Sequence, residues 1–281
     1  MINAYYNGEF TSTERVKIPL SDRAVFFGDG VYDAAIGRNG KIYMEEAHIE
    51  RFLRNAREMD IPLPLCREEL TDALHTIAEC APTEGFFLYF QLTRYGQERK
   101  HSYPDTEKSN LLITATPFIP KAPDVTLTLD EAEDIRYLMC NVKTLNLLPA
   151  VLASKKAERN GCDECVFHRG ETVTECAHSN IHIVKGGEII SHPRDCHILP
   201  GTAGKRLFEL AAEMGIPVTE RPFSLSELKF ADEVLVTSSS KLCLRAKQFC
   251  GVKYRTDSRS VGLALCERMA EDFHKNTEKD C

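Results

Sequence analysis

Lys143 stands in the stretch MCNVKTLNLL, among apolar residues that are typical of a buried strand entering a core. A lysine in such a place either reaches water with its ammonium group or is held in a pocket. Because burial disfavours the charged form of an amine, a lysine held in a pocket is a nucleophile suited to Schiff-base formation with an aldehyde. Taken alone, Lys143 leaves both interpretations open.

Glu175 is a second residue whose chemistry depends on a partner. In the stretch ETVTECAHSNIHIV, strand alternation places Val173 and Glu175 on one face and Thr172 and Thr174 on the other. A carboxylate on a buried strand face is costly unless a cation pairs with it. The protonated ring nitrogen of pyridoxal phosphate is such a cation. An exposed strand glutamate is the alternative interpretation.

The chain contains eleven cysteines, and one subset has metal-ligand spacing. Cys162, Cys165, Cys176 and His178 form the pattern C-x2-C-x10-C-x-H, which is compatible with a zinc-binding module. Against this hypothesis, the first two cysteines follow a helix end at Gly161, whereas Cys176 belongs to a strand of another hairpin. The zinc module remains an alternative from a different functional class.

Composition is that of a globular protein with a sizeable core, with 43% hydrophobic and 27% charged residues. The net charge of −7 and the scattered lysines and arginines argue against a nucleic-acid partner but leave small anionic ligands open. No apolar run is long enough to cross a bilayer, and MINAYYNGEF lacks the features of a signal peptide. We therefore expect no membrane partner, a cytoplasmic location and reduced thiols.

A Pro-rich linker at residues 117–123, PFIPKAP, divides the chain into a small N-terminal α+β domain (1–116) and a larger C-terminal domain (124–281) that carries Lys143. In the first domain we expect strands at Ala4–Asn7, Val16–Ile18, Val31–Ile36, Lys41–Tyr43, 86–93 and 111–116, and helices through Ile49–Met59 and Leu70–Ile77. In the second we expect a strand at Val125–Leu129, helices at 149–160 and 204–214, hairpin turns at 168–171 and 185–188, a cap at Ser224, a strand at 233–237 and a terminal amphipathic helix.

Several runs at consistent spacing resemble the fold-type IV pyridoxal-phosphate enzymes. These runs are DRAVFFGDGVYDA (22–34), HIERFLRNA (48–56), YFQLTR (89–94), DIRYLMCNVKTLNLLPAVLA (134–153), GCDECVFHRGETVTECAHSNI (161–181) and EVLVTSSS (233–240). The resemblance covers nearly the whole chain. It implies a two-domain α+β/α/β protein that binds pyridoxal 5'-phosphate between its domains, with no metal.

The resemblance also implies roles for particular residues. Lys143 matches the lysine that forms the Schiff base and moves a proton at the substrate. Glu175 matches the partner of the ring nitrogen, Arg51 the arginine that binds the phosphate, and Tyr32 a tyrosine on the substrate side of the pocket. Arg136 is similar to a residue that lies near the ring without touching it.

The phosphate cup is implied by two further segments. Ser238 and Ser239, directly after a strand, match part of it. The family usually has Gly-Ile-Thr-Arg after Leu199, whereas this chain has GTAGK, so the resemblance transfers the hydroxyl contact to Thr202. Two other departures are His178, where a small polar residue is common, and Lys241, which begins the run that replaces Glu-Ile-Thr.

The loop RYGQERKHSYP distinguishes members of the family. Arg99 and His101 match an Arg-x-His pair that, with Tyr32, holds the substrate carboxylate in D-amino acid aminotransferases. In the family this loop comes from the neighbouring subunit, so the resemblance implies a homodimer. The implied reaction is transamination between a D-amino acid and a 2-oxo acid. Alternatives on the same fold are a branched-chain L-amino acid or amine transaminase and an aminodeoxychorismate lyase.

Overall fold

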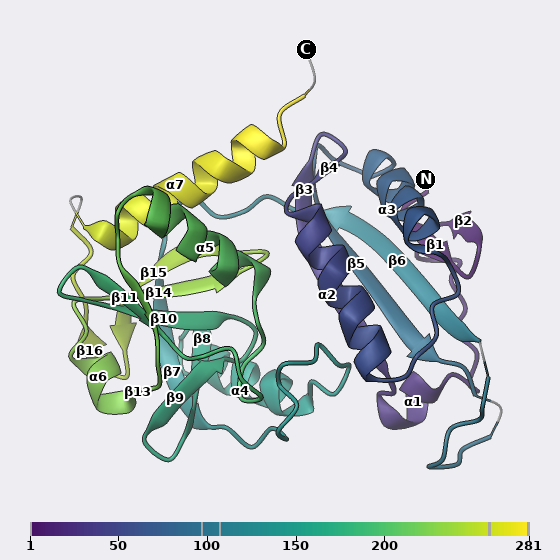
Figure 1. The fold of residues 1–281 in the computed structure, drawn as a ribbon, viewed down its shortest axis with the longest axis horizontal. Helices are drawn as coiled ribbons and strands as arrows, with labels where there is room; N and C mark the ends of the chain where they lie inside the picture. The colour runs from purple at the N-terminus through teal and green to yellow at the C-terminus, as the bar shows by residue number, and fades with distance from the viewer. Residues whose placement is uncertain (1, 97, 107, 258–259, 280–281) are drawn as a thin grey trace. The chain divides into compact units, whose positions relative to one another are not determined.

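The computed structural model describes residues 2–96, 98–106, 108–257 and 260–279. It divides the chain into two compact units, each containing a sheet of its own (Figure 1). The first unit comprises Met1–Ile119, Val142–Asn146 and His274–Cys281, and the second comprises Pro120–Asn141 and Leu147–Phe273. Among the described residues, no helix combines the length and apolar character that crossing a bilayer requires.

The first unit is an antiparallel sheet in the order β2-β1-β6-β5-β3-β4. Its strands are β1 (Ala4–Tyr6), β2 (Glu9–Thr11), β3 (Gly30–Arg38), β4 (Lys41–Ile42), β5 (Gly85–Arg94) and β6 (Ser109–Pro117). Its helices are α1 (Arg23–Phe27), α2 (Glu45–Glu58) and α3 (Arg67–Glu79). In β5, Leu88 and Phe90 are buried with Phe52 of α2, whereas the alternate residues Tyr89 and Gln91 are half-buried. One face of the sheet therefore packs on helices.

The second unit is a mixed sheet in the order β12-β11-β10-β14-β15-β7-β8-β9-β13, with β16 paired to β15. Its strands are β7 (Thr126–Glu133), β8 (Glu164–Arg169), β9 (Thr172–Cys176), β10 (Asn180–Lys185), β11 (Glu188–Ser191), β12 (Val218–Glu220), β13 (Phe223–Ser224), β14 (Glu233–Ser238), β15 (Leu242–Phe249) and β16 (Val252–Lys253). Its helices are α4 (Leu148–Arg159), α5 (Thr202–Glu213), α6 (Leu225–Lys229) and α7 (Val261–Asn276), of which the last residues group with the first unit. The expected α+β/α/β character is confirmed.

One expected strand is wrong. Residues Val16–Ile18 are not in a strand, and β1 pairs instead with Glu9–Thr11. The reason is the turn between them, where Asn7 and Gly8 adopt φ values of 47° and 97°. An Asn-Gly turn with both residues at positive φ closes a hairpin at once, so the partner strand starts directly after the turn.

Lys143 lies in an irregular segment rather than in a strand. Tyr32 N donates to Lys143 O at 2.9 Å, Leu145 N donates to Gly30 O at 3.1 Å, and Val31 and Thr144 form an isolated bridge. These bonds tie the segment to the start of β3. For this reason Val142–Asn146 groups with the first unit, although the division by sequence assigned Lys143 to the C-terminal domain.

Candidate active site

In the first unit, the amine of Lys143 is held against an aromatic pair. Its Nζ lies 4.4 Å from the centroid of the Tyr32 ring, and the Tyr32 and Tyr89 rings stack at 5.4 Å. Tyr89 donates its hydroxyl proton to Gln91 Oε1 at 2.7 Å, and burial raises the pKa of Tyr89. Since the main chain of Lys143 is bonded to Tyr32, the half-buried amine is oriented by both its backbone and its ring contact. The structure thus brings these two predicted site residues together.

Arg51 of α2 forms a buried ion pair with Asp33 of β3. Arg51 Nε donates to Asp33 Oδ2 at 2.8 Å and Nη2 donates to Oδ1 at 2.7 Å, while His48 Nδ1 lies 2.8 Å from Oδ1. Burial alone would raise the pKa of Asp33, but the charges and hydrogen bonds of Arg51 and His48 outweigh it and hold that pKa well below its usual range. Burial lowers the pKa of His48. This anionic anchor orients the Arg51 guanidinium.

Arg99 and His101 meet at one ring. The Arg99 guanidinium carbon lies 5.3 Å from the centroid of the Phe27 ring, and the His101 and Phe27 ring centroids are 5.4 Å apart. Arg23 of α1 fixes the main chain between them, donating from Nη1 to Lys100 O at 2.6 Å and from Nη2 to His101 O at 3.1 Å. The two predicted carboxylate ligands, Arg99 and His101, therefore both pack against the Phe27 ring. Gln97, in the same loop, lies outside the described residues.

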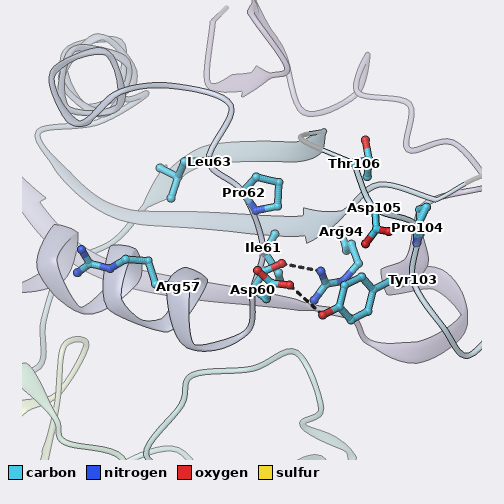
Figure 2. A pocket seen from close by; sticks show the side chains of 10 residues that line it. All are labelled: Arg57, Asp60, Ile61, Pro62, Leu63, Arg94, Tyr103, Pro104, Asp105 and Thr106. Carbon is cyan, nitrogen blue, oxygen red and sulfur yellow. Dashed lines mark hydrogen bonds between the residues drawn. The ribbon is translucent and has the colours of Figure 1, made fainter.

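No hydrogen bond, ion pair or ring contact joins Arg99 or His101 to Tyr32 in the residues that the structure describes. The far end of their loop is fixed at a pocket of about 830 Å³ at the end of α2 (Figure 2). There the Arg94 guanidinium lies 3.7 Å from the Tyr103 ring centroid, and Tyr103 donates to Asp60 Oδ2 at 2.9 Å. None of the predicted site residues lines this pocket. We interpret the contacts of Tyr103 with Arg94 and Asp60 as the ones that hold the end of the loop in place.

In the second unit, the Glu175 carboxylate is buried and surrounded by donors. It accepts from Arg136 Nη1 at 2.5 Å, from Asn180 Nδ2 at 2.9 Å and from Leu199 N at 3.2 Å to both oxygens. Arg136 is itself held by Asp134 at 2.9 Å, and this neighbour and Glu175 outweigh burial to raise the Arg136 pKa. Glu175 thus has a fixed orientation. The predicted alternation was incomplete, because Thr174 is buried as well.

The predicted phosphate-cup residues lie at a helix start and a strand end. Thr202 is the buried first residue of α5, preceded by Gly201, where a Cβ would lie 2.0 Å from Asn180 Oδ1. Ser238 ends β14 and accepts from Lys241 N at 3.1 Å, and Ser239 follows in the turn. The first turn of a helix and a serine-rich turn both offer donors to an anion.

The cysteine pattern does not assemble a metal site. Cys165 and Cys176 are buried, Cys162 is half-buried and His178 is exposed. Among the described residues, the group whose ligand atoms gather within 4.8 Å is His192, Asp195 and His197, not this quartet. Instead, His178 Nδ1 lies 3.1 Å from Glu164 Oε1, so this histidine belongs to a different cluster.

Several neighbours were missed by sequence reasoning. Asp33 follows Tyr32 directly, and its place on the same strand face as the buried Val31 and Ala35 could have indicated a carboxylate that needs a cation. No sequence pattern indicated the roles of Asn180 and Glu164. Asn180 reaches Glu175, and Glu164 reaches His178 and Lys241, only because turns of the chain bring them together. The contacts of Phe27 and Arg23 with the loop that carries Arg99 and His101 were also not predicted.

The residues in place fit pyridoxal phosphate in three respects. The half-buried amine of Lys143 is the kind of group that forms a Schiff base with an aldehyde. A buried carboxylate with fixed donors is available for a protonated ring nitrogen. Gly201 precedes the first turn of α5, where main-chain N–H groups and the Thr202 hydroxyl are suited to bind a phosphate.

Comparison with known proteins agrees with this geometry. The family model for amino-transferase class IV matches residues 30–249. The chain is 37% identical over 243 residues to the D-alanine aminotransferase of Staphylococcus haemolyticus, covering 85% of this chain and 86% of that protein.

Solved structures share the fold at low sequence identity. The branched-chain amino acid aminotransferase from Escherichia coli superposes with a TM-score of 0.88 at 19% identity, covering 99% of this chain and 96% of that one. The branched-chain aminotransferase from the archaeon Thermoproteus uzoniensis, solved with norvaline, gives a TM-score of 0.87 at 20% identity, covering 99% and 96%. The fold-type IV architecture implied by the sequence runs is confirmed. The protein belongs to the class IV aminotransferases and is a pyridoxal-phosphate-dependent enzyme.

Proposed function

We propose that this enzyme transfers the amino group of a D-amino acid to a 2-oxo acid, for example from D-alanine to 2-oxoglutarate, giving pyruvate and D-glutamate. Similarity to the Staphylococcus haemolyticus D-alanine aminotransferase supports the proposal. Within this chain, the main support for the proposal is that Arg99 and His101 both contact the ring of Phe27. A guanidinium fork beside an imidazole suits an α-carboxylate, and it would decide which face of Cα is presented to the base.

We assign Lys143 as the catalytic amine. Bound pyridoxal phosphate supplies an aldehyde carbon and a ring that withdraws electrons from the substrate. Lys143 would hold the cofactor through that aldehyde carbon and would serve as the base that takes the proton from the substrate Cα. Tyr32 supports the amine through its ring and lines the substrate side. Lys143→Ala should therefore abolish turnover.

Glu175 would hold the ring nitrogen in its protonated form. Its support is the set of donors from Arg136, Asn180 and Leu199, which fixes the carboxylate without neutralising its acceptor capacity. The phosphate would be bound by Arg51, oriented by Asp33, together with Thr202, Ser238 and Ser239. Guanidinium, hydroxyl and helix-start N–H donors are the groups that a phosphate dianion prefers.

We further propose a cytoplasmic homodimer in which each chain lends its Arg99–His101 loop to its partner. The lack of a contact from this pair to Tyr32 within the described residues of one chain supports the exchange. Co-refolding Lys143→Ala with Arg99→Ala tests it, because a mixed dimer contains one site with both intact residues. Recovery of activity is expected. Absence of recovery, with dimers formed, would contradict the exchange.

The substrate assignment is tested by 2-oxoglutarate consumption with D-alanine and, in parallel, with L-leucine. Consumption with D-alanine alone is expected. Arg99→Ala should then lower kcat/KM for D-alanine by roughly 10- to 100-fold, as loss of a charged hydrogen bond implies, while the visible cofactor band is retained. Lys100→Ala, in the same loop but exposed and paired with Glu98, is the matched control. Consumption with L-leucine alone would overturn the D-amino acid assignment.

A further inference from the structure

We propose that His192, Asp195 and His197 form a binding site for a divalent transition-metal ion, with zinc as the best-matched ion. The three residues lie in the segment HPRDCH that follows β11 in the second unit. Two imidazoles and one carboxylate are a donor set that zinc accepts, with water in the fourth position. None of the three residues is assigned above to pyridoxal phosphate or to substrate.

The spacing of the donor atoms fits coordination to a metal ion. One ligand atom from each residue lies within 4.8 Å of the others. His192 Nε2 lies 3.3 Å from Asp195 Oδ2, and His197 Nδ1 lies 3.1 Å from Asp195 Oδ1. With zinc–ligand bonds of about 2.0–2.1 Å, the edge of a coordination tetrahedron is about 3.3 Å. The pair His192 Nε2 and Asp195 Oδ2 also lies within hydrogen-bond distance, and the two histidines face different oxygens of the carboxylate.

His192 is the buried member of the proposed site. This residue is only 3% exposed, and within the described part of the chain its Nδ1 has no hydrogen-bond partner. Buried imidazoles kept for structure usually have both nitrogens satisfied. His182 shows this pattern, with Nδ1 2.9 Å from Ser191 Oγ and Nε2 2.9 Å from Thr237 Oγ1. A cation between Nε2 of His192 and the Asp195 carboxylate would use the ring nitrogen that already faces Asp195, and Nδ1 would then carry the proton.

The segment is held in shape by its main chain, so the donors are preorganised. His197 N donates to Asp195 Oδ1 at 2.8 Å, Cys140 N donates to Cys196 O at 3.0 Å, and Arg136 Nη2 donates to His197 O at 3.3 Å. Asp195 and His197 are partly exposed, which gives an ion access from solvent. Two residues further on, Leu199 N reaches Glu175, so a bound ion would brace the segment that supports this carboxylate.

Zinc bound per chain, measured by equilibrium dialysis of the holoenzyme, tests the site. Two variants are compared with the wild type. His197→Ala removes a partly exposed ligand, and Asp195→Asn removes the charge while its amide oxygen can still accept from His197 N. His75→Ala is the matched control, because His75 is an exposed histidine paired with Glu45 on the first unit. All four proteins share the same cysteines, so zinc bound by thiols cancels in the comparison.

We expect the wild type and His75→Ala to bind one equivalent more than the two site variants at low zinc concentration. Affinity at this site should fall by more than about 100-fold in the variants, since even neighbours of metal ligands contribute 10- to 100-fold. Retention of the visible cofactor band in every variant separates this outcome from a failure of folding or of the aminotransferase assignment. Equal zinc in all four folded proteins would overturn the proposal.

Discussion

Nζ of Lys241 lies 2.7 Å from Nε2 of His178, and both side chains face the buried carboxylate of Glu164. Burial alone would raise the pKa of Glu164, but His178, Lys241 and Ser179 together lower it to about 2. Two of the positions at which the chain departs from the family pattern, His178 and Lys241, therefore belong to one cluster. It joins the segment after β9 to the turn that contains Ser239 and Lys241.

Replacing Lys241 with methionine should destabilise the enzyme. Glu164 is fully buried, and removing one partner of a buried ion pair typically costs about 3 kcal/mol or more because the other charge remains. We expect a clear fall in the denaturation midpoint of the holoenzyme in urea. Adding Glu164→Gln to Lys241→Met should restore much of the loss, since the uncompensated charge is then gone.

The control for this prediction is Lys155→Met, which removes an exposed lysine paired with Glu158 on α4. Exposed pairs contribute little, so no measurable change is expected there. If Lys241→Met and Lys155→Met shift the midpoint equally, the cluster around Glu164 does not stabilise the second unit as the geometry indicates.

Phe27→Leu should weaken substrate binding and leave cofactor binding unchanged. The ring supports both Arg99 and His101, and contacts of these kinds contribute about 0.5–1 kcal/mol each. We expect KM for D-alanine to rise by about 5- to 30-fold with little change in kcat, measured by steady-state kinetics. Phe230→Leu, at an exposed phenylalanine of the second unit, should change neither constant. An unchanged KM in Phe27→Leu would show that the Phe27 ring does not position Arg99 and His101 for substrate binding.

Sequence patterns predicted helix ends well where residues close in the sequence determine them. The Ser224 cap is present with its full capping box to Glu227, and the Asn160-Gly161 stop ends α4. Prediction failed where an element depends on pairing with a segment that is distant in the sequence. Strand β15 has no clear alternation because both of its faces are buried, so it was not foreseen.

The same contrast holds in the candidate site. The strand alternation around Glu175 suggested a buried carboxylate that pairs with the cofactor ring nitrogen. The ion pair with Arg136 was not predicted from that pattern. The pairing of Arg51 with Asp33 could not be read from either residue. It requires α2 to pack on the face of β3 that carries Asp33, which is a property of the tertiary fold.

Asp33→Asn should reduce affinity for the cofactor as well as stability. The substitution leaves the Arg51 guanidinium buried without its anion, which typically costs about 3–5 kcal/mol, and it frees the side chain from its bidentate geometry. We expect apoenzyme of this variant to need a higher concentration of pyridoxal phosphate for half-saturation, measured by the visible band. Glu58→Gln, at an exposed glutamate paired with Arg54, is the control. Destabilisation without any change in half-saturation would argue against Arg51 as a phosphate ligand.

His182 should make stability fall as the pH drops below about 6.5. Burial, followed by the charge of Arg194, lowers the pKa of His182 to about 3. Between these values the unfolded chain binds a proton that the folded chain does not, so the free energy of unfolding decreases by about 1.4 kcal/mol for each pH unit. Between pH 6.5 and 5 the loss from this residue amounts to about 2 kcal/mol. Glu164, with its pKa lowered to about 2, adds a loss in the same direction only below about pH 4.5.

His182→Gln isolates this contribution. A glutamine can still bond to Thr237 or Ser191 but does not titrate, so its stability should depend less on pH than that of the wild type. The measurement is urea denaturation of both proteins at several pH values between 5 and 7.5. His48 is buried with a lowered pKa and titrates in the same direction, but it is present in both proteins and cancels in the difference. Parallel curves for the two proteins would mean that His182 is protonated in the folded state, in conflict with its buried position between two hydroxyls.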